Sequence, residues 1–228
     1  MIGIIGAMAE EVAWLRAQMT DVMEETFGIA TLYTGTLFGH KTVLSRCGIG
    51  KVHAALCAQA MIVRCRPEWV LNIGVAGALR EGLDIGHIVV GDYAVQYDID
   101  TTAFGDPMGC VPEINQVQLP CDRTLSDRLC AACETQKLPF VRAGIATGDR
   151  FVADVASKEA LDRAFGAAAC DMEGGAIAQV CVEMNTPYAA YRVISDTLRG
   201  NEQDYEKNVA AAGLSSQRLL RALLAGSV

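Results

Sequence analysis

The sequence has little that could hold a metal ion. It contains only three histidines, and His40, His53 and His87 lack the short spacing of metal ligands. One Cys-x-x-Cys pair, Cys130 and Cys133, has no second pair and no nearby histidine. Two small apolar residues on one turn of a helix explain that spacing better, and we expect no metal site.

Positive charge is also scarce. The chain has 27 acidic and 19 basic residues, which gives a net charge of −8. Its overall charge does not attract nucleic acid or an anionic membrane, and this argues against both as partners.

We expect no segment for export or membrane insertion. The apolar start Met1–Ala9 has no basic flank and runs into two glutamates, unlike a signal peptide. The longest charge-free stretch, Thr26–His40, has 15 residues and is too short for a bilayer. The nine cysteines are odd in number and lie mostly in apolar runs, as reduced thiols do. These features predict a cytoplasmic protein.

Apolar residues, by contrast, are abundant. Of 228 residues, 51 % are hydrophobic and 20 % charged, which excludes a disordered chain. A folded chain of this size buries about 70 % of the surface that its unfolded form exposes, enough for a core without staples. We expect one domain over residues 1–228, because no linker, repeat or low-complexity segment divides the sequence.

Strand and helix patterns alternate along the chain. Short apolar runs predict strands at Met1–Gly6, Ile29–Tyr33, Thr42–Arg46, Trp69–Ile73, Ile88–Gln96, Phe140–Ala146, a stretch ending at Asp171, and Tyr188–Ile194. Helical spacing predicts helices at Glu10–Met19, Gly50–Arg64, about Asp122–Gln136, Lys158–Phe165, Glu173–Met184 and about Asp204 to Leu224. Phe38-Gly39-His40 predicts a hairpin turn. The Gly- and Pro-rich segment Asp98–Pro120 predicts a long loop of the kind that forms a lid or contact arm.

This alternation predicts an α/β fold with a central mixed sheet and helices on both faces. In such sheets the functional site lies beyond the carboxyl ends of the strands. Four segments place useful residues there: Gly3–Glu11, Asn72–Gly77, Asp171–Ala176 and Tyr191–Asp196. Each also has a purely structural explanation, namely acids at a helix start, a tight strand exit, close helix packing and a helix N-cap.

Together these segments bring three carboxylates, Glu11, Glu173 and Asp196, and one arginine, Arg192, to the same sheet edge. Paired carboxylates suit glycoside cleavage, because one can protonate the leaving group while another activates water. No Ser-His-Asp, Cys-His or phosphate-binding loop competes with this interpretation.

The four segments, in this order and spacing, resemble the 5′-methylthioadenosine/S-adenosylhomocysteine nucleosidase family, whose fold is that of the purine nucleoside phosphorylases. The resemblance runs from Met1 to about Leu224. The matching motifs are Gly3–Glu11, Cys47–Lys51, Thr102–Gly105, Thr147–Phe151, Asp171–Glu173 and Ile194–Asp196.

The resemblance implies an N-glycosyl hydrolase that releases adenine and needs no cofactor. Asp196 would protonate N7 of the purine, with Ser195 orienting the carboxyl group. Glu11 would polarise the attacking water, and Glu173 would hold the ribose hydroxyls. The other implied contacts with the small-molecule nucleoside are Met172 against the ribose, Phe151 stacked on the purine, the Val152 backbone on the purine edge, Met8 and Ile49 lining the pocket, Arg192 near the water and Tyr205 as a cover.

The resemblance also implies a homodimer. Phe104 and Pro112 of the partner subunit would cover the 5′-end of the ligand. Three positions depart from the family pattern. Val75 replaces a Ser or Thr near the ribose and water, Asp171 replaces the more usual Glu, and Asp106 stands where an aromatic residue is common.

Three other functions compete with this interpretation. One is a nucleosidase for another 5′-substituted adenosine such as aminofutalosine, another is a purine nucleoside phosphorylase, and the third is a non-catalytic purine-nucleoside-binding protein. The first strand–helix connection offers Glu10 and Glu11 and no base before Arg16, which favours water over phosphate as the nucleophile. The complete set of carboxylates speaks against a protein that only binds.

Overall fold

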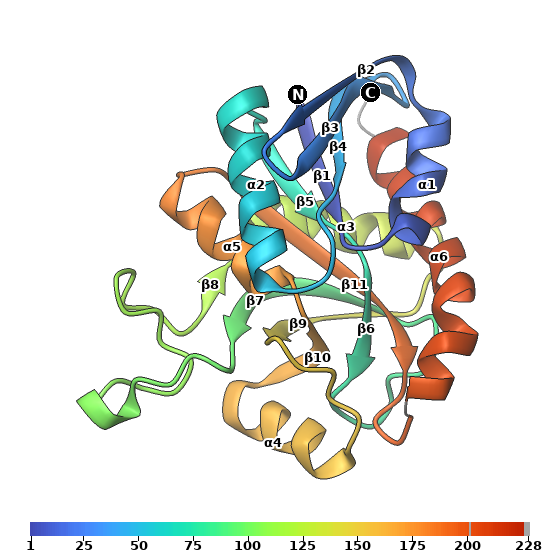
Figure 1. The fold of residues 1–228 in the computed structure, drawn as a ribbon. Coiled ribbons are helices and arrows are strands. Elements are labelled where there is room, and N and C mark those ends of the chain that lie inside the picture. Colours follow the sequence, from blue (N-terminus) through green and yellow to red (C-terminus); the bar gives the residue numbers. More distant parts are fainter. Residues whose placement is uncertain (201, 226–228) are drawn as a thin grey trace.

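Within residues 1–200 and 202–225, which the computed structural model describes, eleven strands hydrogen-bond into one sheet (Figure 1). The strands are β1 Ile2–Gly6, β2 Thr20–Phe27, β3 Ala30–Leu37, β4 His40–Arg46, β5 Trp69–Asn72, β6 Val75–Ala78, β7 Ile88–Gln96, β8 Leu119–Pro120, β9 Phe140–Thr147, β10 Ala167–Asp171 and β11 Tyr188–Asp196. The helices are α1 Ala9–Gln18, α2 Lys51–Cys65, the short 3₁₀ turn η1 Thr102–Phe104, α3 Arg123–Thr135, α4 Val155–Phe165, α5 Gly174–Glu183 and α6 Glu202–Ala225.

The sheet is mixed, and part of it closes on itself. The strand order is β2-β3-β4-β1-β5-β11-β6-β10-β9-β7-β8, and β11 pairs in addition with β7. The strands β11, β6, β10, β9 and β7 therefore form a closed ring. The core strands β4, β1, β5 and β11 run parallel, whereas β6 meets β10 and β7 meets β11 in antiparallel fashion.

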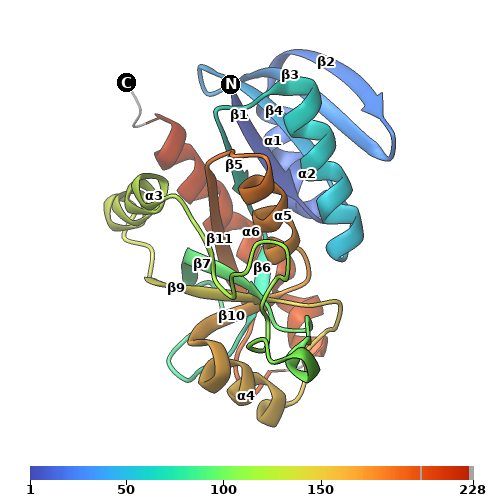
Figure 2. The ribbon, with the colours of Figure 1, turned by 90° about the vertical axis from the view of Figure 1, so that its left-hand side faces the viewer.

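Helices cover both faces of the sheet. On one face α2 and α5 pack together over a core that includes Cys57, Met61 and Ile177. On the other face α1, α3 and α6 pack over a second core that includes Leu15 and Leu129. Figures 1 and 2 show the two helical layers on opposite sides of the strands, with α4 below them against β9 and β10. The predicted fold class, an α/β fold with a mixed central sheet and helices on both faces, is confirmed.

The predicted elements agree with the structure to within a few residues, but three strands, β2, β6 and β8, were not predicted. Strand β2 has mostly exposed, polar residues and lies at the edge of the sheet, so it carries no alternation of apolar and polar residues. Strand β6 is only four residues long and was taken for a Gly-rich strand exit. The predicted hairpin joins β3 to β4, and its turn residues Phe38 and Gly39 both have positive φ, as a type I′ turn requires.

The segment Asp98–Pro120 is partly ordered rather than a plain loop. It contains η1, a bridge between Val111 and Gln116, and the short strand β8 that pairs with β7. Figure 1 shows the part around η1 projecting away from the rest of the molecule. No helix within the described part of the chain is long and apolar enough to cross a membrane.

Candidate active site

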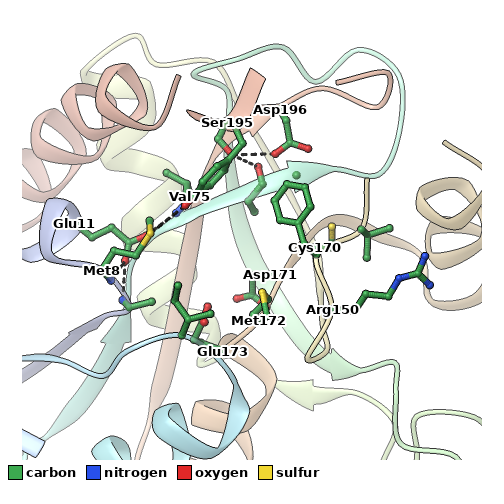
Figure 3. A pocket seen from close by; sticks show the side chains of 17 residues that line it. Met8, Glu11, Val75, Arg150, Cys170, Asp171, Met172, Glu173, Ser195 and Asp196 are labelled. Carbon is green, nitrogen blue, oxygen red and sulfur yellow. Dashed lines mark hydrogen bonds between the residues drawn. The ribbon is translucent and has the colours of Figure 1, made fainter. Parts of the chain in front are cut away.

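A pocket opens where strands β1, β10 and β11 end (Figure 3). Its cavity volume is about 210 Å³. Three acids predicted to act together, Glu11, Glu173 and Asp196, line it. The other lining residues are Ala7, Met8, Ile49, Val75, Ala76, Gly77, Arg150, Phe151, Val152, Cys170, Asp171, Met172, Ser195 and Tyr205.

Backbone amides hold the carboxylate of Glu11 in place. Its Oε2 accepts hydrogen bonds from the backbone N–H groups of Ala7, at 2.6 Å, and Met8, at 3.0 Å, and its Oε1 accepts one from Val75 at 3.2 Å. Glycine at position 74 leaves room for this acid, since a Cβ there would lie 2.9 Å from Oε1. Burial nevertheless raises the pKa of Glu11, because the desolvation of the charged form outweighs these bonds and the field of Arg192. A fixed carboxylate with a raised pKa is suited to accept a proton from water.

Beneath the pocket, Arg192 forms a buried ion pair with Asp171. The guanidinium donates to Asp171 Oδ2 and to the side-chain oxygen of Asn72, and Thr147 donates to the other oxygen of Asp171. This network uses the donors of Arg192 within the protein. Arg192 does not line the pocket, contrary to the expected contact near the water, and it acts on the site through the acids around it.

The network explains two glycines at the start of α5. A Cβ on Gly174 would lie 2.7 Å from Asp171 Oδ2 and 3.1 Å from Arg192 Nη2. A Cβ on Gly175 would lie 2.7 Å from Gln96 and 3.0 Å from Thr147. Both glycines therefore allow the helix to begin directly above the buried ion pair, at a cost in helix propensity of about 1 kcal/mol each.

Glu173 has a strongly perturbed carboxyl group. Its Oε1 accepts a hydrogen bond from the backbone N–H of Gly50 at 2.8 Å, and the residue is only 8 % exposed. Burial and, to a smaller extent, the nearby carboxylate of Asp171 raise its pKa to about 7. The bond from Gly50 and the charge of Arg192 oppose this rise. Glu173 therefore carries a proton for part of the time near neutral pH.

We expect Glu173→Gln to raise the thermal midpoint of unfolding at pH 8 and to leave it nearly unchanged at pH 4. The pKa of Glu173 is about 7 when folded, against 4.5 for the ordinary side chain, so burying the charge destabilises the fold increasingly as pH rises between those values. The penalty above pH 7 is on the order of 2–3 kcal/mol, and the neutral amide removes it. Calorimetry at both pH values measures the difference, with the exposed Glu134→Gln as control. An equal gain at both pH values would contradict the assignment.

At the other end of the pocket, both oxygens of Asp196 have partners. Ser195 Oγ lies 3.1 Å from Oδ1 and donates a hydrogen bond to it, and Lys158 Nζ donates to Oδ2 at 2.7 Å. Lys158 lies on α4 and is fully buried. Gly77 permits this close approach, because a Cβ there would lie 2.8 Å from Asp196 Oδ2. Asp196 is thus held by one hydroxyl group and one ammonium group.

Aromatic and sulfur-bearing side chains form one wall of the pocket. The rings of Phe151 and Tyr205 meet edge to face at 5.7 Å, and the Tyr205 hydroxyl group lies 3.0 Å from the sulfur of Met8. Ile49 is 57 % exposed at the rim. This wall gives an apolar substituent or a flat base a surface to pack on.

The structure brings most of the predicted site residues together, but not all. Phe104 is 88 % exposed on η1 and does not line the pocket of its own chain, and neither does Pro112. Sequence reasoning missed Lys158, the contact of Asp196, and Arg150, which lines the pocket and pairs with Asp154. In the described residues no cluster of three His, Cys, Asp or Glu side chains could hold a metal ion.

Comparison with known proteins gives a consistent family. The sequence matches the Phosphorylase superfamily over residues 1–225. It is 35 % identical over 226 residues to 5′-methylthioadenosine/S-adenosylhomocysteine nucleosidase of Staphylococcus aureus strain MRSA252, covering 98 % of this chain and 99 % of that protein.

Two solved structures share the whole fold. The 5′-methylthioadenosine/S-adenosylhomocysteine nucleosidase of Neisseria meningitidis, in complex with methylthio-immucillin-A, has a TM-score of 0.94 and 31 % identity, with 99 % of this chain and 98 % of that one covered. Futalosine hydrolase of Helicobacter pylori strain 26695 has a TM-score of 0.91 and 30 % identity, with 97 % and 96 % covered. The chain belongs to the phosphorylase superfamily and is a nucleosidase of the branch that contains these enzymes.

Proposed function

We propose that this protein hydrolyses the N-glycosidic bond of 5′-methylthioadenosine and S-adenosylhomocysteine and releases adenine and a 5-thio-substituted ribose. The observation that carries the proposal is a pocket with the acid candidate Asp196 across from the base candidate Glu11, and with Glu173 below them in the view of Figure 3. Acid and base on opposite sides of one bond are what hydrolysis of a glycoside needs.

The purine would lie at the Asp196 end. Adenine is a poor leaving group as an anion, so a proton must reach N7 as the bond to C1′ breaks. Asp196 would give that proton, and Ser195 would hold the carboxyl group in line. Phe151 would stack on the base, and the backbone of Val152 would bind its edge.

The ribose would lie between Met172 and the two glutamates. Glu173 would accept hydrogen bonds from the ribose hydroxyls, and Glu11 would take a proton from the water that attacks C1′. The transition state resembles an oxocarbenium ion, which nearby carboxylates stabilise. Met8 and Ile49 offer an apolar surface to a 5′-thio substituent, which supports thioethers as substrates.

Water is a better nucleophile here than phosphate. Among the described residues that line the pocket, Arg150 is the one cation, and it lies at the surface in an ion pair with Asp154. The buried cations Lys158 and Arg192 are paired with Asp196 and Asp171. A phosphate dianion would therefore meet acidic side chains without a free positive partner.

A nucleosidase acting on aminofutalosine is the second candidate, and the similarity to futalosine hydrolase supports it. Incubation of the protein with each nucleoside, with and without phosphate, tests both candidates. Free 5-methylthioribose from methylthioadenosine supports our proposal. Release of adenine from aminofutalosine alone identifies the second candidate, and a sugar 1-phosphate product identifies a phosphorylase. Binding without turnover identifies a non-catalytic protein.

We also propose a homodimer that completes the pocket. Helix α2 exposes Val52, Leu56 and Val63 on one face, and Ile49 precedes them at the pocket rim. Such an apolar stripe needs a cover. In the projecting segment, Phe104 and Pro112 are exposed and do not line the pocket of their own chain. A second copy would receive this segment at its 5′-substituent end.

We therefore expect Phe104→Ala to weaken binding of methylthioadenosine by roughly 5- to 150-fold, the effect of removing about 1–3 kcal/mol of apolar burial. Titration calorimetry measures the change, and Met23→Ala, at an exposed apolar residue on β2, is the control.

Sedimentation at micromolar protein tests whether the protein is a dimer. A fully active species with the mass of one chain would refute the dimer and the shared site.

A further inference from the structure

Lys158 is a buried charge that the proposed reaction does not yet use. Its side chain is 0 % exposed, and lysine is almost never fully buried unless its ammonium group is paired. Lys158 is also the one buried residue of α4, on the face that carries Val155 and Leu161. The fold places this cation directly behind the proposed acid, on the oxygen of Asp196 that Ser195 does not bind.

Two backbone carbonyls hold the ammonium group in addition to Asp196. Lys158 Nζ donates to the carbonyl oxygens of Thr197, at 2.8 Å, and Gly200, at 3.1 Å. All three of its protons are therefore used. These two carbonyls hold the ammonium group independently of Asp196, so it keeps two acceptors when Asp196 loses its proton.

Few other groups act on Asp196. Ser195, its neighbour on β11, is neutral, and the thiol of Cys170 on β10 and the phenol of Tyr205 on α6 face it across the pocket. Burial raises the pKa of Cys170 to about 12 and that of Tyr205 to about 12, so both stay neutral at physiological pH. Lys158 is the charged group in contact with Asp196.

We propose that Lys158 is a positioning residue that makes Asp196 a stronger acid toward the purine. This inference rests on the proposed function. In the chemical step the O–H bond of Asp196 breaks and an N7–H bond forms, while the electron pair of the C1′–N9 bond moves to the purine. Water adds its oxygen to C1′ and gives its proton to Glu11. Negative charge thus appears on Asp196 as the proton leaves, and Lys158 lies 2.7 Å from the oxygen that receives it.

The same charge has an opposite effect before the reaction. An ammonium group in contact with a carboxyl group favours the ionised form of that group over the protonated form. The enzyme gains driving force for proton transfer and loses population of the reactive form as pH rises. Removal of Lys158 must therefore lower the driving force for proton transfer and raise the population of the reactive form of the enzyme.

The test is the pH dependence of kcat/KM for methylthioadenosine in Lys158→Met and Lys158→Gln. We expect the alkaline limb of the profile to move up by about one pH unit or more, because removal of a contacting opposite charge favours the protonated acid. The rate on the low-pH plateau should fall roughly tenfold, because the acid is weaker. Arg163→Met, which removes an exposed cation of the same helix, should leave the profile unchanged.

A purely structural role for Lys158 would lower the rate at every pH without moving the limb, and that result in a folded variant overturns the inference. If neither variant folds, infrared difference spectra of the wild type against Asp196→Asn, followed as pH rises, decide. A protonated-carboxyl band that disappears along the alkaline limb of the wild-type profile supports the inference, and a band that persists beyond that limb overturns it. Release of adenine by the wild-type protein is measured separately, so failure of the proposed function is distinguishable from failure of the role of Lys158.

Discussion

Asp196→Asn is expected to lower kcat for methylthioadenosine by at least about 10³-fold while changing nucleoside affinity less than about tenfold. The amide fits the same space and can still face the purine, so the ground-state contacts remain. It has no acidic proton to give when the glycosidic bond breaks. Because that proton is needed mainly in the transition state, the loss falls on turnover rather than on binding.

The ion pair with Lys158 adds a second consequence for the same variant. Asn leaves the buried ammonium group without an opposite charge, which is expected to cost about 3 kcal/mol of folding stability. Adding Lys158→Met to Asp196→Asn should restore much of the thermal midpoint without restoring turnover.

Single-turnover kinetics and calorimetric binding, both well below the thermal midpoint, separate the two effects of Asp196→Asn. Asp127→Asn, an exposed acid on α3, is the control. An Asp196→Asn variant with turnover near that of the wild type would remove Asp196 from the role of acid.

Sequence reasoning located the carboxylates because parallel strands leave a strong signal. Buried strands such as β5 and β11 read as continuous apolar runs, and the polar residue that follows each run lies at the sheet edge. The sequence alone therefore indicates Glu11, Glu173 and Asp196. The edge strand β2 gave no such signal, because its residues face solvent.

The sequence does not predict the role of Lys158 in the site, and it does not predict the direction of the Arg192 side chain. A lysine within a helix is typical of a solvent-facing position, yet Lys158 lies on the inner face of α4 between Val155 and Leu161. The apolar residues Val155 and Leu161, three positions before and after Lys158, were the one feature of the sequence that indicated burial of this lysine. The family resemblance implies a position for Arg192 near the attacking water, but the side chain of a strand residue can point to either face. Here it points to Asp171, at a depth that only packing determines.

The second large effect is expected for Glu11→Gln, which should lower steady-state hydrolysis by about 10²- to 10⁴-fold with the fold preserved. The water that attacks C1′ must lose a proton, and an amide cannot accept it. Folding should suffer little. The amide oxygen can keep the hydrogen bonds from Ala7 and Met8, and the loss is confined to the bond from Val75, which the amide nitrogen cannot accept.

Glu10→Gln is the matched control, because the neighbouring acid is exposed at the same helix start and does not line the main pocket. It keeps the helix and loses one charge, so any general effect of acidity at this terminus would appear in both variants.

Addition of phosphate distinguishes a hydrolase from a phosphorylase, because phosphate attacks as an anion and needs no base. If phosphate restored turnover to Glu11→Gln with a sugar 1-phosphate as product, the pocket would be that of a phosphorylase. If hydrolysis persisted in Glu11→Gln without phosphate, Glu11 would not be the base, and the three amides that hold it would need another explanation.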